Sequence, residues 1–116
     1  MSWHEVIDER SHELHQVIAA ILREDPSKLK VALAWVDKLL SDPGYSAQSK
    51  VALAEWRDLM ESEGLKGVLA VLSDRGERAT RMRHSSPFAL LMPQDKRQEI
   101  FSRYEARRPR ARPPSI

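Results

Sequence analysis

Apolar residues recur at intervals of three and four positions along most of this chain, and no stretch of useful length alternates apolar with polar residues. Such intervals match the 3.6-residue turn of an α-helix, whereas a half-buried strand requires a period of two. The pattern therefore predicts an all-α protein. We expect helices at about residues 2–23, 26–40, 47–61, 65–72, 75–84 and 93–107, with one further helical turn at 87–91.

Chain length bounds the domain organisation. A chain of 116 residues has the usual size of one domain and can bury one modest core. We expect a compact single-domain bundle of five to six helices over residues 1–107. The run Arg-Arg-Pro-Arg-Ala-Arg-Pro-Pro that follows cannot pack against this bundle, so residues 108–116 are expected to form a disordered basic tail.

Several helix boundaries carry recognisable signals. Ser2 and Glu5 have the S-x-x-E spacing of a capping box, in which each side chain accepts the backbone N–H of the other residue. Asp25-Pro26 is typical of an N-cap followed by proline at the first helical position. Asp74 and Glu77 repeat the capping-box spacing at the start of an arginine-rich segment. Gly64 and Pro87 are residues that end helices.

Charge is divided unevenly along the chain. Residues 1–74 hold 8 Lys/Arg and 13 Asp/Glu, a net charge of −5, whereas residues 75–116 hold 11 and 4, a net charge of +7. Such an asymmetry indicates association with partners. The chain has no cysteine, no secretory signal pattern and no apolar run near the roughly 20 residues that span a bilayer. We therefore expect a cytoplasmic protein without a membrane segment.

No set of residues in the sequence is typical of an enzyme. Glu9 and His12 have the Glu-x-x-His spacing of di-iron bundles, but such a site needs a second copy and two more inward carboxylates. Both residues also fall on the predicted solvent face of the first helix. Ser85 and Ser86 beside His84 lack a nucleophile elbow and an acid partner, and four isolated glycines cannot form a phosphate loop. We expect no catalytic residues, no metal and no cofactor.

Three large side chains differ in how well they fit the apolar stripes of their helices. Arg10 projects within the apolar arc of the first helix and is the misfit of that arc. Trp35 lies beside the main apolar stripe of its helix, where a core role and a partner contact are equally good explanations. Trp56 sits within a periodic stripe, so we expect it in the core.

The basic last third offers a surface for an acidic partner. Lys96, Arg103 and Arg107 align on one face of the last expected helix, and the tail adds further arginines, which together could follow a phosphate backbone. No helix-turn-helix is evident and no aromatic residues interleave the arginines, which disfavours base-specific reading. Alternatively, Glu99 pairs with Arg103 and solvent takes the rest, or the patch meets the acidic first helix of a second copy.

One longer pattern points to a family. Its most distinctive part is Ser85-Ser86-Pro87-Phe88-Ala89, and it extends over about residues 10–101 through Leu14-His15, Ile18-Ala19, Leu22, Asp25-Pro26, Trp56, Leu59-Met60, Leu69, Leu72, Glu77, Arg83, Arg97 and Ile100. In this order the residues resemble a family of small bacterial antitoxins, typically encoded beside nucleotidyltransferase-like toxins. The chain departs from the family at Leu90, where relatives often have glycine, and at Met92-Pro93-Gln94, where a capping Ser or Thr is expected.

The resemblance implies an antitoxin that neutralises its cognate toxin by direct protein–protein binding. Longer relatives carry a helix-turn-helix domain before this region, so the resemblance implies toxin binding more than DNA binding. Phe88 is expected in the core, as are Leu90 and Leu91 of the same helical turn. Two alternatives stay open, a nucleic-acid-associated helical protein that uses the basic last helix and tail, and a homo-oligomerisation or adaptor module. The residues expected to contact the partner are Arg10, Trp35, Arg97, Arg103 and Arg107.

Overall fold

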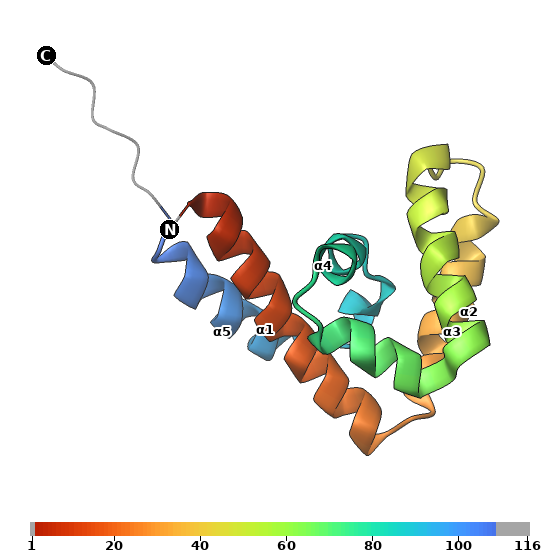
Figure 1. Ribbon diagram of the computed structural model, residues 1–116, viewed down its shortest axis with the longest axis horizontal. Coiled ribbons are helices and arrows are strands. Elements are labelled where there is room, and N and C mark those ends of the chain that lie inside the picture. Colours follow the sequence, from red (N-terminus) through yellow and green to blue (C-terminus); the bar gives the residue numbers. More distant parts are fainter. Residues whose placement is uncertain (1, 109–116) are drawn as a thin grey trace, which may run out of the picture.

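The computed structural model describes residues 2–108, and over that range it contains helices and turns but no strand (Figure 1). Five α-helices and one 3-10 helix follow one another along this part of the chain. They are α1 Trp3–Glu24, α2 Lys28–Leu40, α3 Ala47–Ser73, α4 Glu77–His84, the 3-10 helix η1 Pro87–Leu91, and α5 Gln94–Glu105. The predicted all-α bundle of five to six helices is thereby confirmed.

The described chain continues slightly past the expected end of the helical domain. Arg108, assigned to the tail by the sequence, donates its backbone N–H to the carbonyl of Glu105, and its guanidinium lies 5.4 Å from the ring centroid of Trp3. The rest of the predicted tail, residues 109–116, lies outside the described residues.

Helix α1 begins as its sequence predicts. The Ser2 hydroxyl accepts the N–H of Glu5 at 3.3 Å, and the Glu5 carboxylate accepts the N–H of Ser2 at 3.1 Å, so the capping box is confirmed. More than one side of α1 is buried, because this helix packs against α3, α4 and η1 as well as α5. Its buried residues are Val6, His15, Ile18, Ala19 and Leu22.

Two predicted helix starts are wrong by two residues. The Asp25 carboxylate accepts the N–H of Ser27, and α2 begins only at Lys28. The Asp74 carboxylate accepts the N–H of Gly76, and Gly76 occupies the N-cap position of α4. In both places the aspartate closes a short turn before the helix, a competing use of the same side chain that sequence spacing does not distinguish from a cap.

Helix α3 is broken where a helix end is expected. Gly64 has φ 62° and ψ −153°, a conformation that residues with a Cβ rarely adopt, so residues 47–63 and 65–73 form two helical segments. In Figure 1 the first segment forms a hairpin with α2, and the second turns back toward α1. The predicted division into two helices at this glycine is confirmed.

The main core joins α1, α2, α3, α4 and η1 around two aromatic rings. Trp56 and Phe88 are fully buried and meet edge to face, with ring centroids 5.2 Å apart. The Trp56 Nε1–H also donates to the carbonyl of Met82 at 2.8 Å, which ties α3 to α4. Both residues occupy the core positions predicted for them.

One residue predicted for the core lies on the surface. Leu90 is 45% exposed, whereas Phe88 is buried and Leu91 packs against the main core. The physical reason is the 3-10 conformation of η1, in which side chains three positions apart share a face. Phe88 and Leu91 therefore point inward together, and Leu90 points away.

Helix α5 packs on the N-terminal half of α1 and makes a second, smaller cluster. Val6, Ile100 and Tyr104 are buried there, with Trp3, Leu14, Val17 and Met92 packed around them. Figure 1 shows α5 running beside α1 at the end of the molecule away from the α2–α3 hairpin. None of the described helices is long and apolar enough to cross a membrane.

Candidate functional site

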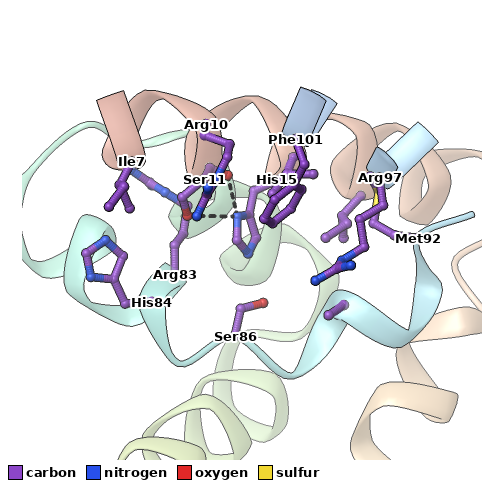
Figure 2. A pocket seen from close by; sticks show the side chains of 13 residues that line it. Ile7, Arg10, Ser11, His15, Arg83, His84, Ser86, Met92, Arg97 and Phe101 are labelled. Carbon is purple, nitrogen blue, oxygen red and sulfur yellow. Dashed lines mark hydrogen bonds between the residues drawn. The ribbon is translucent and has the colours of Figure 1, made fainter. Parts of the chain in front are cut away.

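A cavity of about 330 Å³ opens between α1, α4, η1 and α5 (Figure 2). On α1 its lining includes Leu14, which packs on the cluster shared with α5, and Ile18, which belongs to the main core. His84 of α4 contacts Asp8, and Phe101 and Arg103 of α5 contact Arg10 and Glu13, so α4 and α5 both reach the same stretch of α1. Its lining residues are Ile7, Arg10, Ser11, Leu14, His15, Ile18, Arg83, His84, Ser86, Ala89, Met92, Arg97 and Phe101.

The polar part of this wall is cationic. Its positive charge comes from Arg10, Arg83 and Arg97, and none of the thirteen lining residues is aspartate or glutamate. Electrostatic attraction is stronger in a partly enclosed, low-dielectric site than in open water. The cavity therefore favours a negatively charged group. We call this set of residues the cationic cavity.

Two of the arginines meet on one aromatic ring. The guanidinium carbon of Arg10 lies 4.2 Å from the centroid of Phe101, and that of Arg97 lies 4.6 Å from it. Each contact is a cation–π interaction. Phe101 thus explains why an arginine occupies the apolar arc of α1, because the arc faces an aromatic ring of α5 at this point.

Arg83 is held rigidly at the inner wall. It is only 4% exposed, and its Nη1 donates to the carbonyl of Val71 at 2.9 Å and to the carbonyl of Asp74. Its Nη2 lies 3.3 Å from the hydroxyl of Thr80, whereas its buried Nε has no partner among the described residues. Burial lowers the pKa of this guanidinium, yet an arginine stays charged. Arg83 therefore supplies a fixed positive charge.

His15 contributes a neutral ring. It is 6% exposed, and its Nδ1 lies 2.6 Å from the carbonyl of Ser11, so Nδ1 carries the proton and donates it. Burial, reinforced by the charge of Arg83, lowers the pKa of His15 to about 4. Nε2 is therefore a hydrogen-bond acceptor at neutral pH, and it too has no partner within the described chain. In Figure 2 the ring extends from α1 on the side of Ser86.

The acidic side of α1 is paired within the same chain. Glu9 lies 2.6 Å from Arg75, Asp8 lies 2.8 Å from His84, and Glu13 lies 2.6 Å from Arg103. Arg103 thus pairs with α1, and the predicted pair with Glu99 is wrong, since the carboxylate of Glu99 lies 3.8 Å from Lys96 instead. These three α1 carboxylates are therefore already paired with basic side chains of the same molecule.

The structure brings some of the predicted contact residues together and separates others. Arg10 and Arg97 meet at the cationic cavity, Arg103 is bound to Glu13, and Arg107 lies 4.7 Å from the ring of Tyr104. Trp35 lies elsewhere, on a second cavity formed by α2, α3 and residues 84–87. The Ser85-Ser86-Pro87 segment separates the two cavities, and Ser86 lines both.

Sequence reasoning did not single out His15, Arg83 or Phe101 as parts of a site. For Arg83 a signal was present, because it lies three and four positions from Thr80 and Ala79 and so shares the buried face of α4 with Ala79 and Met82. An arginine inside an apolar arc was the signal that marked Arg10. Phe101 had no such mark, since an aromatic residue in an amphipathic helix is ordinary core.

No protein-family model, curated protein or solved structure matches the chain. Within residues 2–108 no group of three or more histidine, aspartate or glutamate side chains could hold a metal ion. The Glu9–His12 pair has other partners, since Nε2 of His12 donates to the carbonyl of Ser73 at 3.0 Å. The cationic cavity places arginine side chains beside an apolar surface, a combination that suits an anion with an apolar body.

Proposed function

We propose that this protein is a cytoplasmic antitoxin, not an enzyme, that neutralises a cognate toxin protein by direct binding through the face that carries the cationic cavity. The observation that carries the proposal is the meeting of Arg10 and Arg97 on Phe101 at a cavity without a lining carboxylate. Arginine and aromatic side chains are enriched among the residues that dominate binding energy in protein interfaces.

The segment that carries the family resemblance supports the same face. Ser86 and Ala89 line the cationic cavity, while Phe88 between them is buried in the main core. The Ser86 hydroxyl accepts the N–H of Phe88 at 3.2 Å and starts η1. The distinctive run therefore positions part of the proposed docking face, and a role in binding is consistent with its place.

The chemistry of the cavity indicates what a partner would offer. An acidic side chain would meet Arg97, which is exposed, and Arg10, which is half-buried. Apolar groups next to that acid would cover Phe101 and Met92, which are both partly buried. Covering these two side chains would exclude water from the ion pairs that the acid makes with the arginines, and the ion pairs would become stronger.

The nucleic-acid alternative has less support from the described basic side chains. Lys96 and Arg103 lie against carboxylates of the same chain, and Arg107 lies over Tyr104. Each would have to leave its partner to follow a phosphate backbone. Binding to DNA or RNA that falls steeply with salt would favour this alternative over the antitoxin.

An oligomerisation module also has less support. It was suggested by the opposite charges of the two parts of the chain, and three of the acidic residues of α1 already pair with basic residues of their own molecule. Self-association at low salt would favour the module.

A growth-rescue experiment tests the proposal. The gene adjacent to the one for this chain is expressed alone, with the wild-type chain, and with the variants Arg97→Glu and Lys66→Glu. Both sites are exposed and lie in the first turn of a helical segment, where glutamate is tolerated, so both variants should fold. We expect the neighbour to arrest growth, and the wild type and Lys66→Glu, but not Arg97→Glu, to restore it. A harmless neighbour that does not co-purify with this chain would contradict the proposal.

A further inference from the structure

We infer that the cationic cavity is a binding site for a small organic carboxylate with an apolar body, and that the protein binds such a ligand without any partner protein. The inference goes beyond the proposed antitoxin function, since it concerns the isolated chain. It rests on the unpaired arginines, on the fixed charge of the buried Arg83, and on the size and polarity of the walls.

The first observation is that positive charge at the cavity is unpaired. Among the residues that the structure describes, neither Arg10 nor Arg97 has a carboxylate or a side-chain hydrogen-bond partner, and their contact is with the ring of Phe101. A guanidinium that packs its face on an aromatic ring keeps its N–H groups for a planar acceptor, which a carboxylate provides. Arg83 adds a third positive charge at the inner wall.

The second observation concerns two buried residues of the lining, the charged Arg83 and the neutral His15. Nε of Arg83 is a donor and Nε2 of His15 is an acceptor, and neither has a partner among residues 2–108. Both residues are more than nine-tenths buried. Both atoms are enclosed by the protein and do not contact the cavity interior, so the ligand does not bind them directly, and Arg83 acts on it through its fixed positive charge.

The third observation is the character of the remaining walls. Ile7, Leu14, Ile18, Met92 and Phe101 contribute apolar surface to the lining. The volume of about 330 Å³ corresponds to roughly eleven water molecules at about 30 Å³ each. A doubly charged phosphate would lose more hydration against such walls than a singly charged carboxylate. The geometry therefore favours one carboxylate attached to an aromatic or aliphatic body.

The test is a titration of the isolated chain labelled with ¹³C at the methionine methyl groups. Phenylacetate is the probe, with its neutral methyl ester and inorganic phosphate as matched ligands. Met92 lines the cavity and reports binding, whereas Met60 is buried away from it in the main core and serves as the internal control. We expect phenylacetate to shift the Met92 signal in a saturable way, and the ester and phosphate to leave it unchanged.

Two variants show whether the arginines bind the carboxylate. Arg97→Gln and Arg10→Gln each remove a charged donor, and each is expected to weaken phenylacetate binding by at least about tenfold. Lys66→Gln, which removes an exposed charge on α3 that is not part of the lining, is expected to leave it unchanged.

Three results would overturn the inference. The first is that the Met92 signal does not shift at up to about 10 mM phenylacetate, because a specific site should have a dissociation constant below that concentration. The second is an equal shift with the ester or with phosphate. The third is that Arg97→Gln binds phenylacetate as well as the wild type does. Failure here is separate from failure of the antitoxin proposal. Carboxylate binding without rescue of a toxic neighbour leaves only this inference standing, and rescue without carboxylate binding leaves only the antitoxin.

Discussion

Phe88 and Leu90 stand two positions apart in the same 3-10 turn and meet opposite surroundings. Phe88 is fully buried against Trp56, whereas Leu90 is 45% exposed. Both are large and apolar, so hydrophobicity alone does not separate them. The backbone conformation of η1 does, because its period of three places Leu91, not Leu90, beside Phe88.

Phe88→Ala is therefore expected to destabilise the protein far more than Leu90→Ala. Emptying a fully buried phenylalanine site costs about 3–5 kcal/mol, because transfer free energy is lost and a cavity remains next to Trp56. Truncating the exposed leucine should cost less than about 1 kcal/mol. Urea unfolding followed by tryptophan fluorescence measures both, and similar losses for the two variants would contradict the assigned core.

His15 illustrates how burial sets the chemistry of a single residue. Its ring is buried and lies near the positive charge of Arg83, and these surroundings lower its pKa from 6.5 to about 4. In the unfolded chain the ring would take up a proton near pH 6.5. The unfolded state therefore binds more protons between these values, and the folded state loses stability as the pH falls from about 6.5 to about 4.

His15→Gln is expected to remove this part of the pH dependence. The wild type should lose roughly 2–3 kcal/mol more unfolding free energy than the variant between pH 7 and pH 4. Urea unfolding at pH 7, 5.5 and 4 gives the comparison. His4→Gln is the control, because His4 is exposed and should leave the slope of the wild type intact. Parallel pH profiles for His15→Gln and the wild type would refute the buried neutral ring.

At the scale of elements, the break in α3 decides which helices can meet. Residues 47–63 pair with α2, and residues 65–73 return to α1 and carry Val68 and Leu72 into the main core. A straight helix through Gly64 would direct the second segment away from α1. Gly64 makes the change of direction possible because its φ of 62° and ψ of −153° suit a residue without a Cβ.

Gly64→Ala is expected to destabilise the fold by about 1–3 kcal/mol, although open space surrounds the added methyl group. The reason is backbone strain, not collision. Gly44→Ala is the matched control, since Gly44 does not need a positive φ and its added Cβ would meet only one carboxylate oxygen, at 3.2 Å. Thermal unfolding of the two variants provides the measurement. Equal stability of Gly64→Ala and the wild type would mean that the break does not depend on this conformation.

The helices could largely be predicted from the sequence, and the cavity could not. Periodicity, the Ser2–Glu5 capping box and the glycine break are local signals, and each was enough to place a helix or its end. The starts of α2 and α4 were predicted two residues too early, because the aspartate before each helix can cap a helix or close a turn equally well. The cationic cavity depends on where α5 and α4 settle along α1, which is decided by tertiary packing and leaves no local mark.

At the scale of the whole molecule, the division of charge along the sequence has a different meaning in space. The acidic front and the basic last third meet on α1, where Asp8, Glu9 and Glu13 pair with His84, Arg75 and Arg103. Exposed pairs of this kind contribute little stability, about 0–1 kcal/mol each. They do neutralise much of the charge contrast. Among the described residues of the cationic cavity, Arg10 and Arg97 have no carboxylate partner and lie over the ring of Phe101.

The affinity of the purified chain for the product of its neighbouring gene is the most direct test of the proposed docking face. Calorimetric titration compares the wild type with Arg97→Glu and Lys66→Glu at one fixed salt concentration. We predict that Arg97→Glu weakens binding at least about tenfold, or 1.4 kcal/mol, whereas Lys66→Glu stays within about twofold of the wild type. Equal affinities of all three proteins, or no binding by the wild type, would contradict the account.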